Sequence, residues 1–402
     1  MVAFRTLDDF DVRGKRVLVR ADLNVPMKDG QVTDATRLER LAPTLDELAQ
    51  KGARVIVLSH FGRPEGKPSA QFSLGPLAPA LSRSLGGRNV RFAHDCVGPE
   101  AKTAIARLQP GEVALLENLR FDPGEETNDR AFAEKLAALG DIYVDDAFSC
   151  AHRAHASVEA LARILPAAAG RLMQAELDAL DRALERPARP LAALVGGAKV
   201  SSKLDLLGNL VQKVDALIIG GAMANTFLAA QGIAVGKSLC ERDLVGTARR
   251  ILDSAARRKT SILLPLDAVV AEKLAPGARS RVVDIAKVPE DEMILDIGPE
   301  TAEALEKQLE GFRTLVWNGP LGAFEVPPFD AATNRVARGA AALTRSGELL
   351  TVAGGGDTAA ALAHAGVIDD FSYVSTAGGA FLEWLEGKKL PGVAALEAAI
   401  RR

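Results

Sequence analysis

Short aliphatic runs alternate with longer helix-patterned stretches along the whole of this 402-residue chain. Continuous apolar runs bounded by glycine and polar residues are typical of strands buried on both faces of a sheet. Strands that alternate with helices pair in parallel through right-handed crossovers, with helices on both sides. We therefore predict an α/β fold. The expected strands span residues 17–19, 55–58, 113–116, 142–144, 191–195, 216–219, 262–264, 314–317, 349–353 and 372–375.

Helix signals separate these runs and suggest a boundary near residue 187. Asp34 is expected to cap a helix that ends at Gly52. Residues 171–185 are typical of one amphipathic helix, and Pro187 and Pro190 follow closely, so that helix cannot continue. The helix should bury one apolar face, formed by Met173, Leu177, Leu180 and Leu184. We interpret the chain as an N-terminal domain (1–170), a connecting helix or hinge (171–186) and a C-terminal domain (187–377) joined as two Rossmann-like halves.

The composition excludes several classes of protein. Hydrophobic residues make up 48% and charged residues 25% of the chain, which is ordinary globular usage. A net charge of −3 argues against binding to nucleic acid or a membrane surface through bulk charge. Cys96, Cys150 and Cys240 are far apart and form no CxxC pair, so we expect no disulfide framework or zinc site. Without a signal core or a long apolar stretch, we expect a soluble cytoplasmic protein.

In the first half of the chain, the residues after each strand are rich in arginine. In open α/β sheets the ligand lies beyond the carboxyl ends of the strands, so these positions should face one site. A lone arginine is usually a solvated surface charge. Several arginines at equivalent positions instead favour a small, multiply anionic ligand, because the guanidinium fork matches carboxylate and phosphate. The arginines concerned are Arg20, Arg63, Arg120 and Arg153, together with Arg37 at the start of the first helix.

In the second half, the strand ends are rich in glycine. Glycine lets backbone N–H groups approach phosphate oxygens, although a single such turn is equally well explained as a tight connection. Asp357 is a natural Mg²⁺ ligand, and the Thr358 hydroxyl should point at whatever occupies its loop. Lys199 and Lys203 are four residues apart and should share a helix face. The glycine turns lie at 196–197, 220–221, 354–356 and 378–379, and together they predict a nucleotide site.

Other short motifs carry no function. Residues 232–238 are one residue too short between their glycines for a Walker A loop, and no G-x-G-x-x-G or H-E-x-x-H motif occurs. We interpret Trp317 as a structural residue beside the nucleotide site, and His94 and His364 as surface or turn residues.

Taken together and in order, the motifs resemble the phosphoglycerate kinase family over essentially the whole chain. In the first half the resemblance rests on R-A-D-L-N-V-P (20–26), S-H-F-G-R-P (59–64), L-L-E-N-L-R-F (115–121) and D-A-F…A-H-R-A-H-A-S (146–157). In the second half it rests on G-G-A-K-V-S-S-K (196–203), W-N-G-P-L-G-A-F-E (317–325), G-G-G-D-T (354–358) and S-T-A-G-G-A (375–380). The resemblance implies a glycolytic, Mg²⁺-dependent transferase that moves a phosphoryl group between 1,3-bisphosphoglycerate with ADP and 3-phosphoglycerate with ATP.

The resemblance also assigns roles to residues of this sequence. The residues implied around 3-phosphoglycerate are Asp22, Leu23, Asn24, Arg37, His60, Phe61, Gly62, Arg63, Arg120 and Arg153. Those implied around the nucleotide are Gly197, Ala198, Lys203, Gly220, Gly221, Leu295, Asn318, Glu325, Gly354, Gly355, Gly356, Asp357 and Thr358, with Asp357 on Mg²⁺. For catalysis we expect charge stabilisation by Arg37, Lys199 and the amides at Gly378 and Gly379.

The family likeness further implies a monomer that closes around its substrates, and a C-terminal segment (378–402) that returns to the N-terminal domain after Pro391. The chain departs from the family at Ser149-Cys150, Ala222 and Ala377. If position 377 needs a left-handed φ, alanine there costs about 1–2 kcal/mol. Two alternatives stay open: a nucleotide-binding scaffold with weak catalysis, and a kinase that acts on another phosphorylated acid.

Overall fold

The computed structural model describes residues 4–400, and the chain divides into two compact units. The N-terminal unit contains residues 4–178 and 389–400, and the C-terminal unit contains residues 179–388. Each unit is built on a six-stranded, wholly parallel sheet. This architecture is the α/β fold that the alternation of strands and helices predicts.

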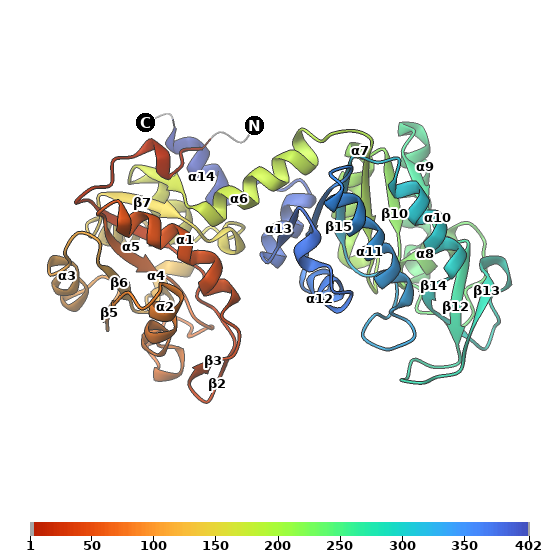
Figure 1. The fold of residues 1–402 in the computed structure, drawn as a ribbon, viewed down its shortest axis with the longest axis horizontal. Helices are drawn as coiled ribbons and strands as arrows, with labels where there is room; N and C mark the ends of the chain where they lie inside the picture. The colour runs from red at the N-terminus through yellow and green to blue at the C-terminus, as the bar shows by residue number, and fades with distance from the viewer. Residues whose placement is uncertain (1–3, 401–402) are drawn as a thin grey trace. The chain divides into compact units, whose positions relative to one another are not determined.

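The sheet of the N-terminal unit places β1 beside both β4 and β7. In sheet order its strands are β5 (Val90–Ala93), β6 (Val113–Leu116), β4 (Arg54–Leu58), β1 (Arg16–Arg20), β7 (Ile142–Asp145) and β8 (Ala167–Ala169). Its helices are α1 (Thr36–Gln50), α2 (Ala78–Ser84), α3 (Pro99–Ala106), α4 (Pro123–Glu126), α5 (Arg130–Ala137) and α14 (Pro391–Ala399), and β2 (Met27–Lys28) pairs with β3 (Gln31–Val32) (Figure 1).

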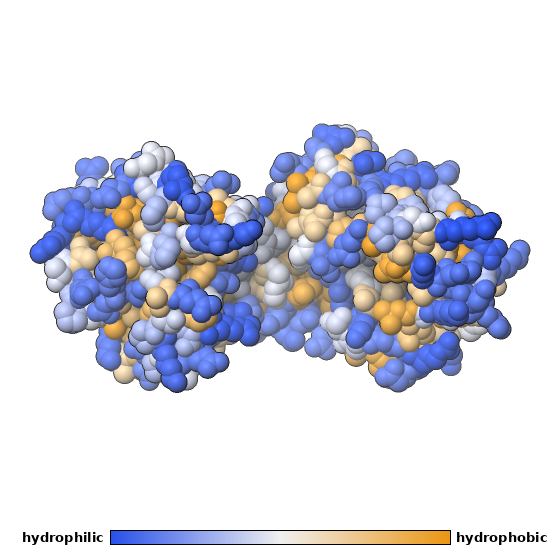
Figure 2. Space-filling model, turned by 90° about the horizontal axis from the view of Figure 1, so that it is seen from below, coloured by the Kyte–Doolittle hydropathy of each residue, from blue (hydrophilic) through white to orange (hydrophobic). Residues whose placement is uncertain are grey.

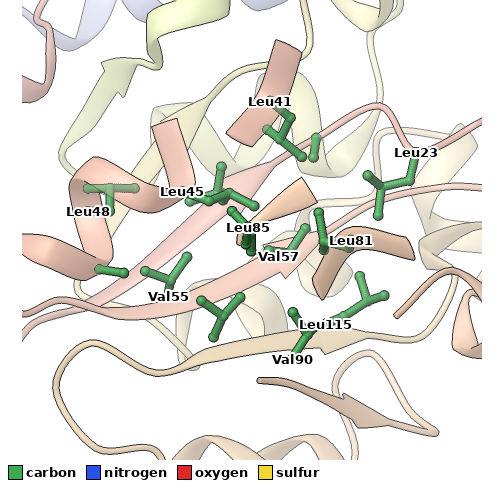
Figure 3. Packing of buried hydrophobic residues seen from close by; sticks show 14 of the residues in the cluster. Leu23, Leu41, Leu45, Leu48, Val55, Val57, Leu81, Leu85, Val90 and Leu115 are labelled. Carbon is green, nitrogen blue, oxygen red and sulfur yellow. The ribbon is translucent and has the colours of Figure 1, made fainter. Parts of the chain in front are cut away.

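One apolar layer of this unit lies between α1, α2 and the sheet. Leu41, Leu45 and Leu48 of α1 point toward Val55 and Val57 of β4 (Figure 3). The helix begins one residue later than expected: Ala35 is its N-cap, and Asp34 Oδ1 accepts the Thr36 N–H over 2.9 Å. At the other end, Gly52 (φ 79°) follows the helix as expected.

The C-terminal unit carries a second parallel sheet and a small antiparallel one. The parallel sheet runs β11 (Ser261–Leu263), β10 (Ala216–Ile219), β9 (Leu191–Val195), β15 (Thr314–Asn318), β16 (Leu350–Gly354), β17 (Tyr373–Ser375), and the antiparallel sheet runs β13 (Ser280–Asp284), β12 (Asp267–Ala271), β14 (Met293–Ile297). Its helices are α7 (Leu204–Lys213), α8 (Met223–Ala230), α9 (Val245–Arg258), α10 (Pro299–Leu309), α11 (Ala331–Arg345), α12 (Gly356–His364) and α13 (Gly378–Leu385).

The boundaries of the two units differ from the expected ones at the connecting helix and near the C-terminus. Helix α6 (Arg171–Leu180) continues as a π-helical turn over Asp181–Glu185, and the division between the units falls at residues 178 and 179. Helix α13 belongs to the C-terminal unit, whereas we expected residues from 378 onward to leave it. The reason is packing: α13 contacts α7 and β16, and Phe381 lies against Gly354.

The chain re-enters the N-terminal unit only at α14. This helix packs against β8 and residues 156–163, and the Gly392 N–H donates to Ala151 O over 2.9 Å. On the face drawn in Figure 2, hydrophilic residues cover most of each unit, with smaller apolar patches between them. Among residues 4–400, no helix combines the length and the apolar character needed to cross a membrane.

Candidate active site

A hydrogen-bonded network joins predicted residues at the carboxyl edge of the N-terminal sheet. Arg37, in the first turn of α1, donates to Asp22 Oδ2 over 2.7 Å and to Asn24 O over 3.0 Å. Asn24 Oδ1 accepts the Gly62 N–H over 3.0 Å, and Gly62 O accepts from Arg120 over 2.6 Å. The loops after β1, β4 and β6 are therefore tied to one another and to α1. We call these residues, together with the neighbouring His60 and Arg153, the basic pocket.

Positive charge gathers around His60 in the basic pocket, although Arg37 pairs with Asp22 and Arg120 pairs with Glu126 over 3.0 Å. The pKa of His60 lies well below its usual range because the ring is buried and because Arg20, Arg120 and Arg153 lie near it. Burial and the same arginines lower the pKa of His155 to about 3. Both rings are neutral at pH 7, so the charge of the pocket comes from its arginines. A pocket of this kind favours an anionic ligand.

Arg20 lies beneath the pocket instead of lining it. Its side chain is 1% exposed, its Nε donates to Ser157 Oγ over 2.8 Å, and its NH2 lies 3.2 Å from His60 Nδ1. Ser157 Oγ in turn donates to Glu125 Oε1 over 2.6 Å. The strand-end pattern suggested that Arg20 would face the ligand directly. Because the last residue of β1 points into the interior, the guanidinium instead supports His60 from below.

Leu23 and Phe61 differ from the other residues expected near the ligand. The Leu23 side chain is 0% exposed and belongs to the apolar core, so only its backbone, whose N–H donates to Ser59 Oγ over 2.9 Å, remains near the loops. The Phe61 ring packs against the same core, and its carbonyl accepts from Asn118 over 2.7 Å. The side chains of both residues therefore support the apolar core, and only their backbone groups remain near the loops.

Sequence reasoning left three supporting residues outside its set. Ser59 and Asn118 follow β4 and β6, and their side chains bind backbone groups of the loops. Ser149, at a position where the chain departs from the family pattern, donates to Asp22 Oδ2 over 2.6 Å. The position of Ser59 and Asn118 within two residues of a strand end was the available signal. For Ser149 the sequence offered none.

Asp22, His60 and Cys150 bring an oxygen, a nitrogen and a sulfur atom within 4.8 Å of one another. Such a donor set could in principle hold a transition metal. However, Arg37 occupies Asp22, and Arg20 lies 3.8 Å from Cys150 Sγ as well as beside His60. A dication would meet these fixed positive charges at close range. The cluster therefore belongs to the anion pocket and is a poor cation site.

Two buried carboxylates lie at the end of β7: Asp145 is its last residue, and Asp146 follows it. Burial raises the pKa of Asp145 to about 6 and that of Asp146 to about 7. Asp146 Oδ1 accepts the N–H groups of Leu172 and Met173 over 2.9 and 3.1 Å, at the first turn of α6. Asp146 thus fastens the beginning of the connecting helix to the end of a central strand.

In the C-terminal unit, Lys203 marks the point where strand order reverses, between β9 and β15. Its ammonium donates to Gly196 O and Asn318 Oδ1, each over 2.6 Å, and to Asn318 O over 3.2 Å. Asn318 Nδ2 donates to Gly354 O over 2.7 Å. Burial lowers the pKa of Lys203 to about 8, although the charge of Asp357 opposes that shift. Ligands of open α/β sheets bind at such a reversal.

A cavity of about 340 Å³ opens beside Lys203's loop. Many of the residues that line it are apolar, including Leu239, Met293, Leu321 and Phe324. A mostly apolar cleft of this size with a few polar groups is the usual form of a small-molecule site. The predicted residues that line it are Gly197, Ala198, Gly221, Leu295, Glu325 and Asp357.

The remaining predicted residues build the frame of this site. Gly355 has φ 101°, and a Cβ there would lie 2.8 Å from Asn318 Nδ2, so the turn requires glycine. The Thr358 hydroxyl donates to Gly354 O and accepts the Gly319 N–H, each over 2.8 Å. The expectation that this hydroxyl points at a ligand is wrong, because it satisfies buried backbone groups. Gly220 packs against Leu321 in the same frame.

Lys199 and Lys203 do not share a helix face. Lys199 lies in the loop after β9, and Lys203 ends a short 3-10 turn, Ser201–Lys203, before α7 begins at Leu204. The predicted helix starts later because the glycines at 196 and 197 and the turn occupy the residues between. Lys199 is exposed, whereas the ammonium of Lys203 is tied to the end of the sheet.

Polar groups that a ligand could bind lie in the first turns of two helices of this unit. Asp357, in the first turn of α12, is exposed, and among residues 4–400 its carboxylate has no hydrogen bond or ion pair. Such a carboxylate is available to a hard cation such as Mg²⁺. Gly378 and Gly379 begin α13, where N–H groups have no partner within the helix. Ala377 has φ −89°, so alanine causes no left-handed strain there.

Comparison with known proteins gives one consistent family. The sequence model described as phosphoglycerate kinase matches residues 7–388. The chain is 64% identical over 398 residues to a protein named phosphoglycerate kinase from Rhizorhabdus wittichii (99% of this chain and 100% of that protein) and 61% identical over 400 residues to one from Agrobacterium fabrum, with the same coverage.

Solved structures agree with the sequence comparisons. A phosphoglycerate kinase structure from Coxiella burnetii has a TM-score of 0.91 at 43% identity, covering 98% of this chain and 99% of that one. A second, from Pyrococcus horikoshii, has a TM-score of 0.81 at 33% identity and covers 99% of this chain and 100% of that one.

Proposed function

Because this chain belongs to the phosphoglycerate kinase family, we propose that it transfers a phosphoryl group reversibly between 1,3-bisphosphoglycerate and MgADP. The products are 3-phosphoglycerate and MgATP. The chain is a phosphotransferase of glycolysis, with a carboxyl group as the acceptor in the ATP-consuming direction. We propose further that it acts in the cytoplasm as a monomer, with small molecules as its only obligatory partners.

The basic pocket is the proposed site for 3-phosphoglycerate. This substrate carries a phosphate and a carboxylate, and the arginines around neutral His60 supply positive charge that suits both groups. Asp22 holds Arg37 in place, since the two side chains are 2.7 Å apart. The residues proposed to surround the substrate are Asp22, Asn24, Arg37, His60, Gly62, Arg63, Arg120 and Arg153, with the backbone of Leu23 and Phe61.

The cavity of the C-terminal unit is the proposed nucleotide site. Its apolar residues suit a purine ring, and Glu325 on its wall offers a carboxylate to ribose hydroxyls. Lys203 and the glycine turn before α12 suit the phosphate chain, because Asn318 binds both the Lys203 ammonium and Gly354 O, next to the first N–H groups of α12. The single observation that carries the proposal is that one cavity is lined both by apolar residues such as Leu295 and by Asp357, the proposed Mg²⁺ ligand.

The chemistry asks little of side chains beyond position and charge. Phosphoryl transfer needs in-line placement and neutralisation of the oxygens of the transferred group. The attacking carboxylate of 3-phosphoglycerate is already ionised at pH 7, so no strong general base is required. Arg37, Lys199 and the N–H groups of Gly378 and Gly379 are the proposed stabilisers of developing charge. Mg²⁺, when bound at Asp357, supplies charge neutralisation to the nucleotide phosphates.

Two units that each hold one substrate must come together for reaction, and closure would also keep water from the phosphoryl group. Residues 171–185 and the Pro187–Pro190 segment are the proposed hinge. Stiffening this segment should lower kcat while each ligand binds separately as before; unchanged turnover would count against the hinge.

Turnover tests the proposal directly. Purified protein is mixed with 3-phosphoglycerate, ATP and Mg²⁺, and the product is coupled to NADH oxidation through glyceraldehyde-3-phosphate dehydrogenase. We expect turnover that requires all three components. Replacing 3-phosphoglycerate by other phosphorylated acids tests the kinase of different specificity. Binding of MgADP with no turnover would favour the scaffold, against which the presence of Arg37, Lys199 and Asp357 argues.

A further inference from the structure

Ser201 stands midway between the two lysines of the proposed nucleotide site. It opens the 3-10 turn Ser201–Lys203, with Lys199 two residues before it and Lys203 two residues after it. The first N–H groups of such a turn have no partner within the turn and must find one elsewhere. The orientation of this turn therefore affects where the backbone of both lysines lies, while Gly196 and Asn318 also hold the Lys203 ammonium.

The partner of Ser201 is Glu241, forty residues away in the sequence. Its carboxylate accepts the Ser201 N–H over 3.0 Å and also the Ser201 hydroxyl. These hydrogen bonds and the nearby charge of Lys199 hold the pKa of Glu241 below its ordinary value, although burial opposes this. A carboxylate at an exposed turn thus plays the part that a local N-cap residue usually plays.

The segment that carries Glu241 is held by two buried residues of α8. Its N–H donates to Thr226 Oγ1 over 3.1 Å, and Asn225 Nδ2 donates to Leu239 O over 3.1 Å. Asn225 and Thr226 are each 1% exposed, so this anchor is part of the packed interior. Leu239 lines the cavity of about 340 Å³. The segment that forms one wall of the cavity therefore also fixes the turn that bears the lysines.

We propose that Glu241 is a positioning residue of the phosphoryl-transfer site: through Ser201 it sets the positions of Lys199 and Lys203 relative to the nucleotide cavity. This inference rests on the proposed function. The proposed role of Glu241 is indirect and involves no contact with a reacting atom. It acts by holding the backbone between two cationic groups in one orientation, and by linking that backbone to the Leu239 wall.

The test uses Glu241→Ala and Glu241→Gln in the full chain. Misplacement of a catalytic group by about 1 Å can lower a rate by up to about a hundredfold. We expect Glu241→Ala to lower kcat by about tenfold or more and to raise the KM for MgATP. The KM for 3-phosphoglycerate should not change, because the basic pocket is built from other residues. Glu241→Gln, whose amide oxygen can still accept the Ser201 N–H, should recover most of the rate.

A matched control and a double-mutant cycle separate positioning from general damage. Glu292→Ala removes another carboxylate of the same unit, paired with Arg281 over 3.2 Å, and should leave both kinetic constants unchanged. Ser201→Ala should lower kcat less than Glu241→Ala, and the double variant should lose no more than Glu241→Ala alone. The Ser201→Ala and Glu241→Gln variants keep the test decisive if Glu241→Ala folds poorly.

The outcomes distinguish this inference from the proposed function. A wild-type chain without turnover contradicts the proposed function itself. If the wild type turns over and Glu241→Ala keeps kcat and the KM for MgATP within about twofold, the positioning role is wrong. Equal losses in Glu292→Ala, or strictly additive losses of Ser201→Ala and Glu241→Ala, would contradict it equally.

Discussion

The N-terminal unit ends its strands in loops that bear arginine, whereas the C-terminal unit ends its strands in loops that bear glycine. Both sheets are parallel and six-stranded. In the first, side chains reach from one element to the next, as from Arg37 of α1 to Asp22 after β1. In the second, the backbone comes close, as at Gly355 beside Asn318. The same type of sheet can therefore present either charged side chains or closely approaching backbone groups at its edge, depending on the residues after each strand.

The largest expected effect comes from removing one charge from each unit. Arg37→Ala and Lys199→Ala should each lower kcat by about a hundredfold or more, because loss of one preorganised charge contact costs about 2–4 kcal/mol in the transition state. Steady-state rates in the coupled assay measure this. Arg130→Ala and Lys307→Ala, which remove exposed charges on α5 and α10, should behave like the wild type. Full activity of either active-site variant would contradict the proposed role of that charge.

Asp357→Asn should affect the C-terminal unit alone. The substitution keeps the size of the side chain and removes the charge that Mg²⁺ prefers. We expect the Mg²⁺ concentration for half-maximal rate to rise about tenfold or more, since a contact to a charged group contributes about 1.5–3 kcal/mol. The KM for 3-phosphoglycerate should stay unchanged. Rates measured across a Mg²⁺ series check this, and an unchanged Mg²⁺ requirement would remove Asp357 from the proposed site.

The pH dependence of nucleotide binding should report the loss of the Lys203 proton. Burial lowers its pKa to about 8, so the free chain loses this positive charge as the pH rises through 8. MgADP should therefore bind more weakly at pH 9 than at pH 7. Lys203→Arg, which stays protonated over this range, should show no such decline even if its affinity at pH 7 is lower. Calorimetric titration at each pH would show it, and parallel profiles of both proteins would contradict the assignment.

Stability should depend on pH through the buried carboxylates of the N-terminal unit. The folded pKa of Asp146 is about 7, above the value of 3.8 for an exposed aspartate, so the folded state binds more protons between these values. Its contribution is complete below the lower value and is lost as the pH rises through 7. The Tm of the wild type should therefore fall between pH 5 and pH 8, and that of Asp146→Asn should fall less.

Asp141 provides the control of opposite sign. Its hydrogen bond to Arg16 lowers its pKa, so Asp141→Asn should lower the Tm throughout pH 5–8 without changing the slope. Calorimetric melting at each pH measures both variants. An Asp146→Asn slope equal to that of the wild type would mean that Asp146 is ionised in the fold.

The sequence predicted the parallel strands well because their aliphatic runs are buried on both faces, as at Leu191–Val195. It missed β8, which is Ala167–Ala169, because alanine carries no strand preference. It likewise missed β5, which is Val90–Ala93, because Arg91 interrupts its apolar run. It also missed the sheet of β12, β13 and β14, where β13 is largely exposed and lacks a continuous apolar run. The length and composition of an apolar run identify a buried strand, whereas the formation of an exposed edge strand depends on the strand that it pairs with.

The candidate site was predictable where a residue follows a strand and less so where its partner is distant. Asp22 and Asn24 follow β1, and both meet Arg37 at the start of α1. The roles of Thr358 and Leu23 were not visible, because only tertiary contacts decide whether a side chain faces a ligand or the interior. Glu241 lies forty residues from Ser201 and follows no strand, so nothing local marked it.

The most direct test of the account is a cross-titration by calorimetry of the wild type, Arg37→Ala and Asp357→Asn with 3-phosphoglycerate and with MgADP. If each unit binds its own substrate, Arg37→Ala should lose about tenfold or more in affinity for 3-phosphoglycerate while its Kd for MgADP stays within about twofold. Asp357→Asn should show the reverse. A variant that weakened both ligands equally would contradict the division of the two substrates between the arginine-bearing and the glycine-bearing unit.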